Sequence, residues 1–269
     1  MTDLPLFAKN LRRVSSILVL ATISLVLPSA ARCDSIGFLY ALEEDFKVLR
    51  GQAPTTTIAV NGTKIHVFRL GPHRVFATRM GAGNVETALN TANLLAKYPC
   101  DWVVSAGPAG TLSTEYVIGD LVRIVKVVGF QRGTWTKGGW ILAEAATVSL
   151  SESVLDLPLL ASAVPDKIAS GDAFIANSSI SARIRAESGC NLVDMNSFGL
   201  AEGCAKAGVP LAIFKIVSDR ADESADLDFK NFIATYGGSL GEALREVIIN
   251  MPVSKSSPDA FENIRKLLP

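Results

Sequence analysis

The chain has 269 residues, enough for one large α/β domain or two small ones with a substantial buried core. Lysine and arginine together number 26, and so do aspartate and glutamate, so no net charge attracts the protein to nucleic acid or to anionic lipid. This balance excludes a strongly electrostatic partner and favours a small-molecule site.

The first 33 residues differ from the rest of the chain. Basic residues precede an apolar run, Val14 to Leu27, which is shorter than the roughly 20 residues that span a bilayer. Small residues follow, and cleavage is expected after Ala31. We therefore predict a signal peptide in residues 1–33 and an exported, periplasmic domain in residues 34–269. An uncleaved membrane anchor or a cytoplasmic protein is the alternative.

The predicted domain begins with a short apolar run, Ser35 to Ala41, which is typical of a buried strand and ends at acidic residues. Because ligands gather at the carboxyl ends of strands in parallel sheets, these acids are candidate site residues. Two β-rich runs, Thr55 to Val60 and Thr63 to Leu70, are separated by Asn61-Gly62. Both residues of that dipeptide accept positive φ, which predicts a hairpin.

The next segment predicts a strand, a glycine loop and a helix. A strand over Arg74 to Thr78 precedes the loop Gly81 to Gly83, and apolar residues then recur at helical spacing from Val85. Trp102 to Ala106 predicts a buried strand that ends in a loop, Gly107 to Gly110.

The second half of the chain continues the alternation. The predicted elements are a strand over Leu121 to Val128, loop and irregular strand over 131–150, a helix from Ser178, a strand over Leu192 to Asp194, a helix over Ser197 to Ala207, a strand over Leu211 to Val217 and a helix from about Asp228 to Asn250. Strands that alternate with helices, plus one antiparallel hairpin, predict a single-domain α/β fold, a three-layer sandwich in which helices flank a central twisted, mixed β-sheet.

Cysteine and histidine are too sparse to predict a metal site. The chain has four cysteines, none in a Cys-x-x-Cys pair, and two histidines. In an oxidising compartment Cys190 and Cys204 could form a disulfide. The other interpretation is that both are small buried hydrophobic residues.

Several short motifs occur in one order over about residues 35 to 250. They are Ile36-Gly37, Ala41-Leu42-Glu43-Glu44, Gly107-Pro108-Ala109-Gly110, Gly119-Asp120, Ser170-Gly171-Asp172-Ala173-Phe174-Ile175, Val193-Asp194-Met195 and Ser218-Asp219. Together they resemble the methylthioadenosine/S-adenosylhomocysteine nucleosidases of the purine nucleoside phosphorylase superfamily. The resemblance implies a purine nucleoside as ligand, a homodimer or higher oligomer, and neither metal nor other cofactor.

The resemblance also implies roles for particular residues. Phe174 would stack on the purine, the backbone at Ile175 would read its edge, and Met195 would pack beneath the ribose. Asp219 would protonate purine N7, because a departing purine anion needs a proton and a positioned acid contributes roughly 10²- to 10⁴-fold. Burial would raise the pKa of this carboxyl group and keep part of it protonated. Without the motifs, Phe174 is typical of a core residue and Asp219 of a helix cap or an ion-pair partner of Arg220.

Three positions depart from the family pattern. Asp45 stands where the family usually carries the glutamate that orients the attacking water. Asn196 replaces the carboxylate that grips the ribose hydroxyls, so charge-assisted bonding is lost and sugar affinity or preference should change. Lys215 replaces an arginine and lacks its planar fork. Structural roles are the alternatives: a first-turn acid, a helix cap and a lysine at a sheet edge.

The remaining candidate substrate contacts are Thr78, Ala106, Gly107 and Ser218. Small residues at the glycine motif let the backbone approach a nucleoside, or they simply make a tight turn. Ser218 directly precedes the candidate acid.

These observations lead to three functional hypotheses. The first is hydrolysis of a purine nucleoside, with Asp219 as general acid and Asp45 holding the water, which is the two-carboxylate logic of glycoside hydrolysis. The second is a phosphorylase, because Thr78, Arg79 and the loop Gly81 to Gly83 offer donors to phosphate. The third is a non-catalytic nucleoside-binding or storage protein on the same fold.

Overall fold

A computed structural model describes residues 35–150 and 163–251 of the chain. The predicted signal peptide and Cys33 lie outside these residues. No helix within the described ranges is long and apolar enough to cross a membrane.

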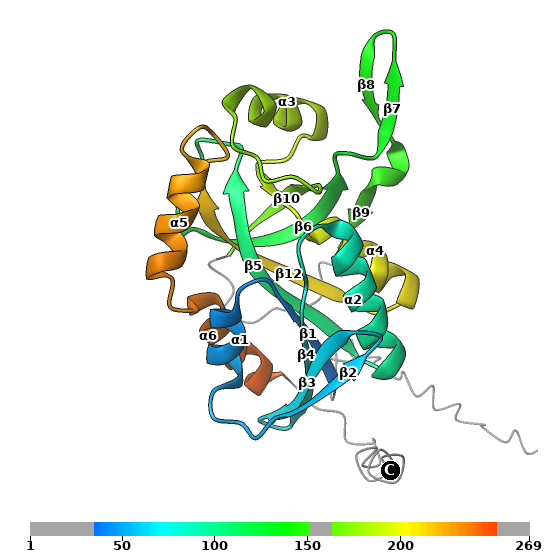
Figure 1. The fold of residues 1–269 in the computed structure, drawn as a ribbon, viewed down its shortest axis with the longest axis vertical. Coiled ribbons are helices and arrows are strands. Elements are labelled where there is room, and N and C mark those ends of the chain that lie inside the picture. The colour runs from blue at the N-terminus through cyan, green and yellow to red at the C-terminus, as the bar shows by residue number, and fades with distance from the viewer. Residues whose placement is uncertain (1–34, 151–162, 252–269) are drawn as a thin grey trace, which may run out of the picture. The chain divides into compact units, whose positions relative to one another are not determined.

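A mixed β-sheet forms the centre of the domain (Figure 1). Its strands are β1 (Ser35–Tyr40), β2 (Thr56–Val60), β3 (Thr63–Leu70), β4 (His73–Arg79), β5 (Trp102–Thr111), β6 (Leu121–Gly129), β9 (Thr147–Ser149), β10 (Val164–Ser170), β11 (Leu192–Asp194) and β12 (Leu211–Asp219). The order is β11-β10-β6-β12-β5-β1-β4-β3-β2, with β9 beside β6. A separate hairpin is formed by β7 (Gly133–Thr136) and β8 (Gly139–Leu142).

Part of this sheet closes on itself. Strand β11 pairs in parallel with β10 and antiparallel with β5, so β10, β6, β12 and β5 are joined into a ring through β11. Strand β5 pairs in parallel with both β1 and β12, which brings the carboxyl ends of these three strands to the same edge. Candidate site residues on β11 and β12 are thereby placed beside β5.

Helices cover both faces of the sheet and give the predicted three layers. The helices are α1 (Glu43–Arg50), α2 (Asn84–Lys97), α3 (Ser178–Ser188), α4 (Ser197–Ala207), α5 (Ala225–Thr235) and α6 (Ser239–Asn250), with a short 3-10 helix at Glu144–Ala146. Helices α1 and α6 pack together on one face, and α2 and α4 pack together on the other. The predicted fold class is confirmed.

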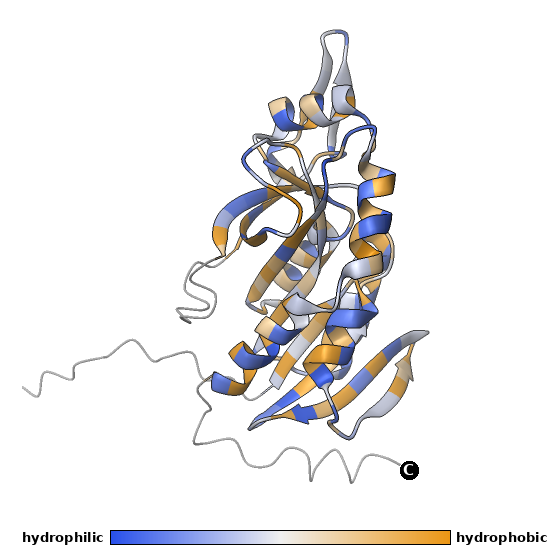
Figure 2. Ribbon diagram, turned by 90° about the vertical axis from the view of Figure 1, so that its left-hand side faces the viewer, coloured by the Kyte–Doolittle hydropathy of each residue, from blue (hydrophilic) through white to orange (hydrophobic). Residues whose placement is uncertain are grey.

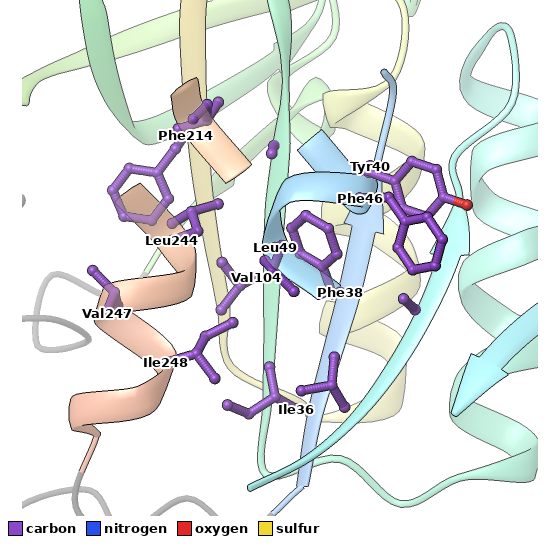
Figure 3. Packing of buried hydrophobic residues seen from close by; sticks show 14 of the residues in the cluster. Ile36, Phe38, Tyr40, Phe46, Leu49, Val104, Phe214, Leu244, Val247 and Ile248 are labelled. Carbon is purple, nitrogen blue, oxygen red and sulfur yellow. The ribbon is translucent and has the colours of Figure 1, made fainter. Parts of the chain in front are cut away.

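The core follows from alternation along the strands. On β1, Ile36, Phe38 and Tyr40 point toward α1 and α6, while Leu39 joins the core on the opposite face. Figure 3 shows Phe38 and Leu49 packed near Val104, with side chains of α6 alongside. Figure 2 shows the corresponding hydropathy pattern: the central strands are largely hydrophobic, and the helices carry hydrophilic stripes. Burial of this apolar surface is the main force that holds the layers together.

Local signals in the sequence predicted several elements correctly. Asn61 and Gly62 both adopt positive φ, 48° and 84°, at the turn between β2 and β3, so the predicted hairpin is confirmed. Helix α4 has the bounds that were predicted. The predicted helix from Asp228 to Asn250 is instead two helices, because Gly238 adopts a left-handed φ of 82° between α5 and α6.

The glycine motif after Trp102 is strand and not loop. Strand β5 runs on through Gly107 and Gly110 to Thr111. The glycines serve close approach, since a Cβ atom at Gly107 would lie 3.0 Å from the Cβ atom of Ala41. Strand β10, which carries the start of the Ser-Gly-Asp motif, was not predicted.

The cysteines show no disulfide among the described residues. Cys190 and Cys204 are both buried and free, and burial raises the pKa of their thiols to about 11 and about 12. The disulfide interpretation of this pair is therefore wrong, and both residues pack as small hydrophobic side chains.

Candidate active site

A pocket opens at the carboxyl ends of β5, β11 and β12. It is lined by Gly110, Ala173, Phe174, Ile175, Val193, Asp194, Met195 and Asp219. The sequence predicted four of these as site residues: Phe174, Ile175, Met195 and Asp219. Its volume is about 30 Å³, so a nucleoside must widen it. Phe174, which is 45% exposed, forms part of the pocket wall.

Asp219 ends strand β12 and is almost fully buried. Its Oδ1 accepts a hydrogen bond from the amide of Ala221 (3.0 Å), and its Oδ2 accepts one from the hydroxyl of Ser218 (2.7 Å). Burial raises the pKa of Asp219, and the two hydrogen bonds only partly offset this effect. The carboxyl group is thus held in place, and its raised pKa lets it keep a proton to higher pH than an exposed aspartate does, as suits a proton donor. Ser218 contributes by orienting the acid.

Phe174 follows the Ser-Gly-Asp motif, and its ring meets a second aromatic ring. The Phe229 side chain on α5 contacts it edge-on, with ring centroids 5.8 Å apart. Ile175, next in the chain, is buried. Phe229 was not predicted as a site residue. The sequence shows an aromatic residue there, but only the contact with Phe174 connects it with the pocket.

The amide nitrogen of Asn196 is hydrogen-bonded to the loop before α2 and to α2 itself. Asn196 precedes α4, and its Nδ2 donates to the carbonyl oxygen of Gly81 (2.7 Å) and to the hydroxyl oxygen of Thr87 (3.1 Å). Met195, its neighbour, lines the pocket. Asn196 therefore joins the pocket to the loop that precedes α2.

Lys215 is fully buried on β12 and forms an ion pair with Asp194. Asp194 belongs to the Val193-Asp194-Met195 motif, but no role was predicted for it from the sequence. The Lys215 Nζ lies 2.6 Å from Oδ2 of Asp194, which lines the pocket. Burial acts to raise the pKa of Asp194, but the Lys215 ammonium and hydrogen bonds outweigh it, and the pKa is lowered. The pair places an ionised carboxylate and a cation beside the pocket. The family resemblance predicted Lys215, as the residue at the position of an arginine.

Asp45 is fully buried in the first turn of α1. Its Oδ1 accepts hydrogen bonds from the Tyr236 hydroxyl (2.6 Å) and the Gly241 amide (2.9 Å), while Oδ2 has no partner among the described residues. Burial raises the pKa of Asp45 to about 6, against the effect of the Tyr236 and Gly241 hydrogen bonds. Asp45 is not among the residues that line the pocket, so the structure does not bring it together with Asp219 there. Its unpartnered Oδ2 retains the capacity to accept a hydrogen bond.

Thr78 and the following loop do not form the predicted anion site. The Thr78 hydroxyl is buried and donates to the carbonyl oxygen of Lys64 (2.9 Å). The loop amide of Ala82 donates to the chain's own carboxylate, Oε2 of Glu86 (2.9 Å). A protein carboxylate thus already occupies one of the donors that were expected to face phosphate, and a backbone carbonyl accepts from another.

Two other predicted contacts lie deeper in the sheet. Ala106 is buried in β5, and its carbonyl oxygen accepts a hydrogen bond from Ala41 (3.0 Å). A Cβ atom at Gly107 would lie 3.5 Å from Nζ of Lys215. Neither residue lines the pocket, and a Cβ atom at Gly107 would meet the Lys215 ammonium group only at an ordinary van der Waals distance. No group of acidic, histidine and cysteine side chains suited to a metal ion occurs in residues 35–150 and 163–251.

Gly110 provides a test of the pocket geometry. A Cβ atom there would lie 2.6 Å from Oδ1 of Asp219, so the Gly110→Ala variant must displace that carboxyl group. We expect kcat to fall by roughly 10²-fold with little change in stability, because small misplacement of a catalytic group is costly. Steady-state kinetics and thermal melts measure this. Gly237→Ala, which meets nothing within 4 Å, is the matched control and should retain activity. A fully active Gly110→Ala would contradict the role of Asp219.

The fold and the pocket define an α/β protein with buried carboxyl groups at the strand carboxyl ends. A family model of the phosphorylase superfamily matches residues 35–249, and the chain belongs to that superfamily.

Individual relatives agree with this assignment. The 5'-methylthioadenosine/S-adenosylhomocysteine nucleosidase of Bacillus thuringiensis subsp. konkukian is 29% identical over 212 residues, covering 74% of this chain and 91% of the relative. That of an Exiguobacterium species is 28% identical over 213 residues, with the same coverage. A futalosine hydrolase mutant of Helicobacter pylori shares the fold with a TM-score of 0.74 and 22% identity, covering 80% of this chain and 98% of that one. The predicted family resemblance is confirmed.

Proposed function

We propose that the protein hydrolyses the N-glycosidic bond of a purine nucleoside and releases the free base. The observation that carries the proposal is that Phe174 and Asp219 open onto the same pocket. The base would lie against Phe174, within reach of the Asp219 carboxyl group, with Met195 beneath the sugar. The similarity to proteins named as nucleosidases supports an enzyme over a storage protein.

The proposed reaction uses two of the buried acids, Asp219 and Asp45, once each. As the bond between sugar C1′ and purine N9 breaks, its electrons pass to the purine and Asp219 gives a proton to N7. Water held by Asp45 then adds its oxygen to the positively charged C1′ and gives up one proton to the Asp45 carboxylate, while Asp219 regains a proton from solvent. The products are the free base and the free sugar. The Lys215 and Asp194 pair keeps a fixed cation and anion beside this path.

Water is favoured over phosphate as the nucleophile. The loop that could have bound phosphate holds Glu86 at the Ala82 amide, and a second anion there would be repelled. The loop also has no support from Thr78, whose hydroxyl is used elsewhere.

A product assay tests the function. Purine nucleosides are incubated with the protein in phosphate buffer and in phosphate-free buffer, and products are separated by chromatography. We expect free base and free sugar at equal rates in both buffers. Sugar phosphate formed only with phosphate would support the phosphorylase, and no release of base from any nucleoside would support the non-catalytic binding protein.

We also propose that the domain is a homodimer and is exported to the periplasm. Large apolar side chains on α2 support association, since Val85 is 70% exposed and Leu89 is 60% exposed. The N-terminal pattern of basic, apolar and small residues supports export. Sedimentation velocity measures the first, and fractionation of cells expressing the full chain measures the second. A monomer, or protein found only in the cytoplasm, would contradict these proposals.

A further inference from the structure

The amide of Asn196 is oriented by its surroundings. Its nitrogen lies 2.7 Å from the carbonyl oxygen of Gly81, which can only accept a hydrogen bond. The opposite orientation would set two oxygens against each other, so the NH₂ group must face Gly81. The Thr87 hydroxyl, at 3.1 Å, donates its own hydrogen to Gly83 (2.8 Å) and therefore accepts from Asn196. Both amide hydrogens are thus committed to the loop and to α2.

Only the carbonyl oxygen Oδ1 of Asn196 is left for a ligand. No donor among the described residues hydrogen-bonds to it, and the side chain is partly exposed next to pocket-lining Met195. This oxygen is neutral and lacks the second, charged oxygen of a carboxylate. A neutral hydrogen bond contributes roughly 2- to 13-fold to binding, whereas one to a charged group contributes roughly 13- to 160-fold.

The neighbouring charge explains why an amide stands here. Glu86 already places a carboxylate on the amide of Ala82, the residue that follows Gly81 in the same loop. A carboxylate at position 196 would lie against the Gly81 carbonyl oxygen with no hydrogen to donate to it, and it would add a second anion to the loop that Glu86 already contacts. The loop requires a donor at this position, and the sugar loses a charged acceptor as a result.

We propose that Asn196 is a specificity-determining residue that relaxes the requirement for the sugar 2′-hydroxyl, so that purine 2′-deoxyribonucleosides are substrates comparable to ribonucleosides. This inference rests on the proposed nucleosidase function. A single neutral acceptor can hydrogen-bond to only one of the sugar 2′- and 3′-hydroxyl groups. Loss of the 2′-hydroxyl should therefore weaken binding only slightly. The absence of an electron-withdrawing 2′-hydroxyl also eases formation of positive charge at C1′.

The first experiment uses the wild-type protein. The ratio of kcat/KM for adenosine to that for 2′-deoxyadenosine is measured in phosphate-free buffer, and likewise for the guanosine pair. We expect a preference for the ribonucleoside of no more than about tenfold. A larger preference overturns the inference and leaves the proposed function standing. No base release from either sugar series overturns both.

A variant pair tests whether Asn196 sets this ratio. Asn196→Asp keeps the size but supplies a charged acceptor, and we expect the ribonucleoside preference to rise by about tenfold, mainly through KM. Thr87→Val is the matched control, because it breaks the same hydrogen-bonded loop without altering Oδ1. It should slow both substrates alike and leave the ratio unchanged. An unchanged ratio in Asn196→Asp, with thermal melts showing a folded protein, would contradict the inference.

Discussion

Replacing Asp219 with asparagine is expected to lower kcat by roughly 10²- to 10⁴-fold, because the amide has no acidic proton to give to the departing purine. The substitution preserves shape. The asparagine Oδ1 can still accept from the Ala221 amide, and the Ser218 hydroxyl can turn to accept from the new NH₂ group. KM and the melting temperature should therefore change little.

The pH profile separates loss of proton transfer from general damage at the pocket. Burial raises the pKa of Asp219, so the wild-type rate should fall as pH rises through that pKa and the acid loses its proton. The asparagine variant should lack this alkaline decline. Asp226→Asn, which changes an exposed acid on α5, is the control and should behave as wild type. A variant at position 219 with half the wild-type kcat would exclude this residue as the acid.

The parts of the fold that the sequence predicted well depend on local geometry. Asn61-Gly62 determines a hairpin through the φ angles that these two residues accept, and apolar spacing is enough to delimit α4. The pairing of β11 with β5 was beyond such reasoning, because it joins segments far apart in the chain. Gly107 and Gly110 were taken for a loop since glycine serves both turns and close packing, and only the neighbouring strand shows which applies.

The candidate site divides in the same way. Phe174, Met195 and Asp219 gather at one pocket as their ordered motifs implied. The directions of individual side chains could not be predicted from the sequence. The Thr78 hydroxyl donates to a backbone carbonyl oxygen, and the Asn196 nitrogen donates to the loop before α2. These directions depend on non-local hydrogen-bond partners, which no spacing rule contains.

Asp45 should affect both the stability of the protein and its activity. Burial raises its pKa from the ordinary value of 3.8 to about 6, so between these values the folded protein binds more protons than the unfolded chain. Stability should therefore fall as pH rises through this window, and the ionised group costs up to about 3 kcal/mol above it. Asp45→Asn removes the charge and should raise the free energy of unfolding at pH 7.5 by roughly 1–3 kcal/mol, with no gain near pH 4.

The same substitution should lower kcat by roughly 10²-fold or more, because an amide cannot take a proton from water. Urea unfolding at the two pH values and nucleoside hydrolysis at pH 7.5 measure both effects. Glu43→Gln, an exposed acid in the same helical turn, is the control and should gain no stability. If Asp45 served only the fold, the Asp45→Asn substitution would leave kcat unchanged. Higher stability together with lower activity is instead the pattern of a group retained for its chemistry, since within residues 35–150 and 163–251 its Oδ2 has no partner that would offset the cost of burying the charge.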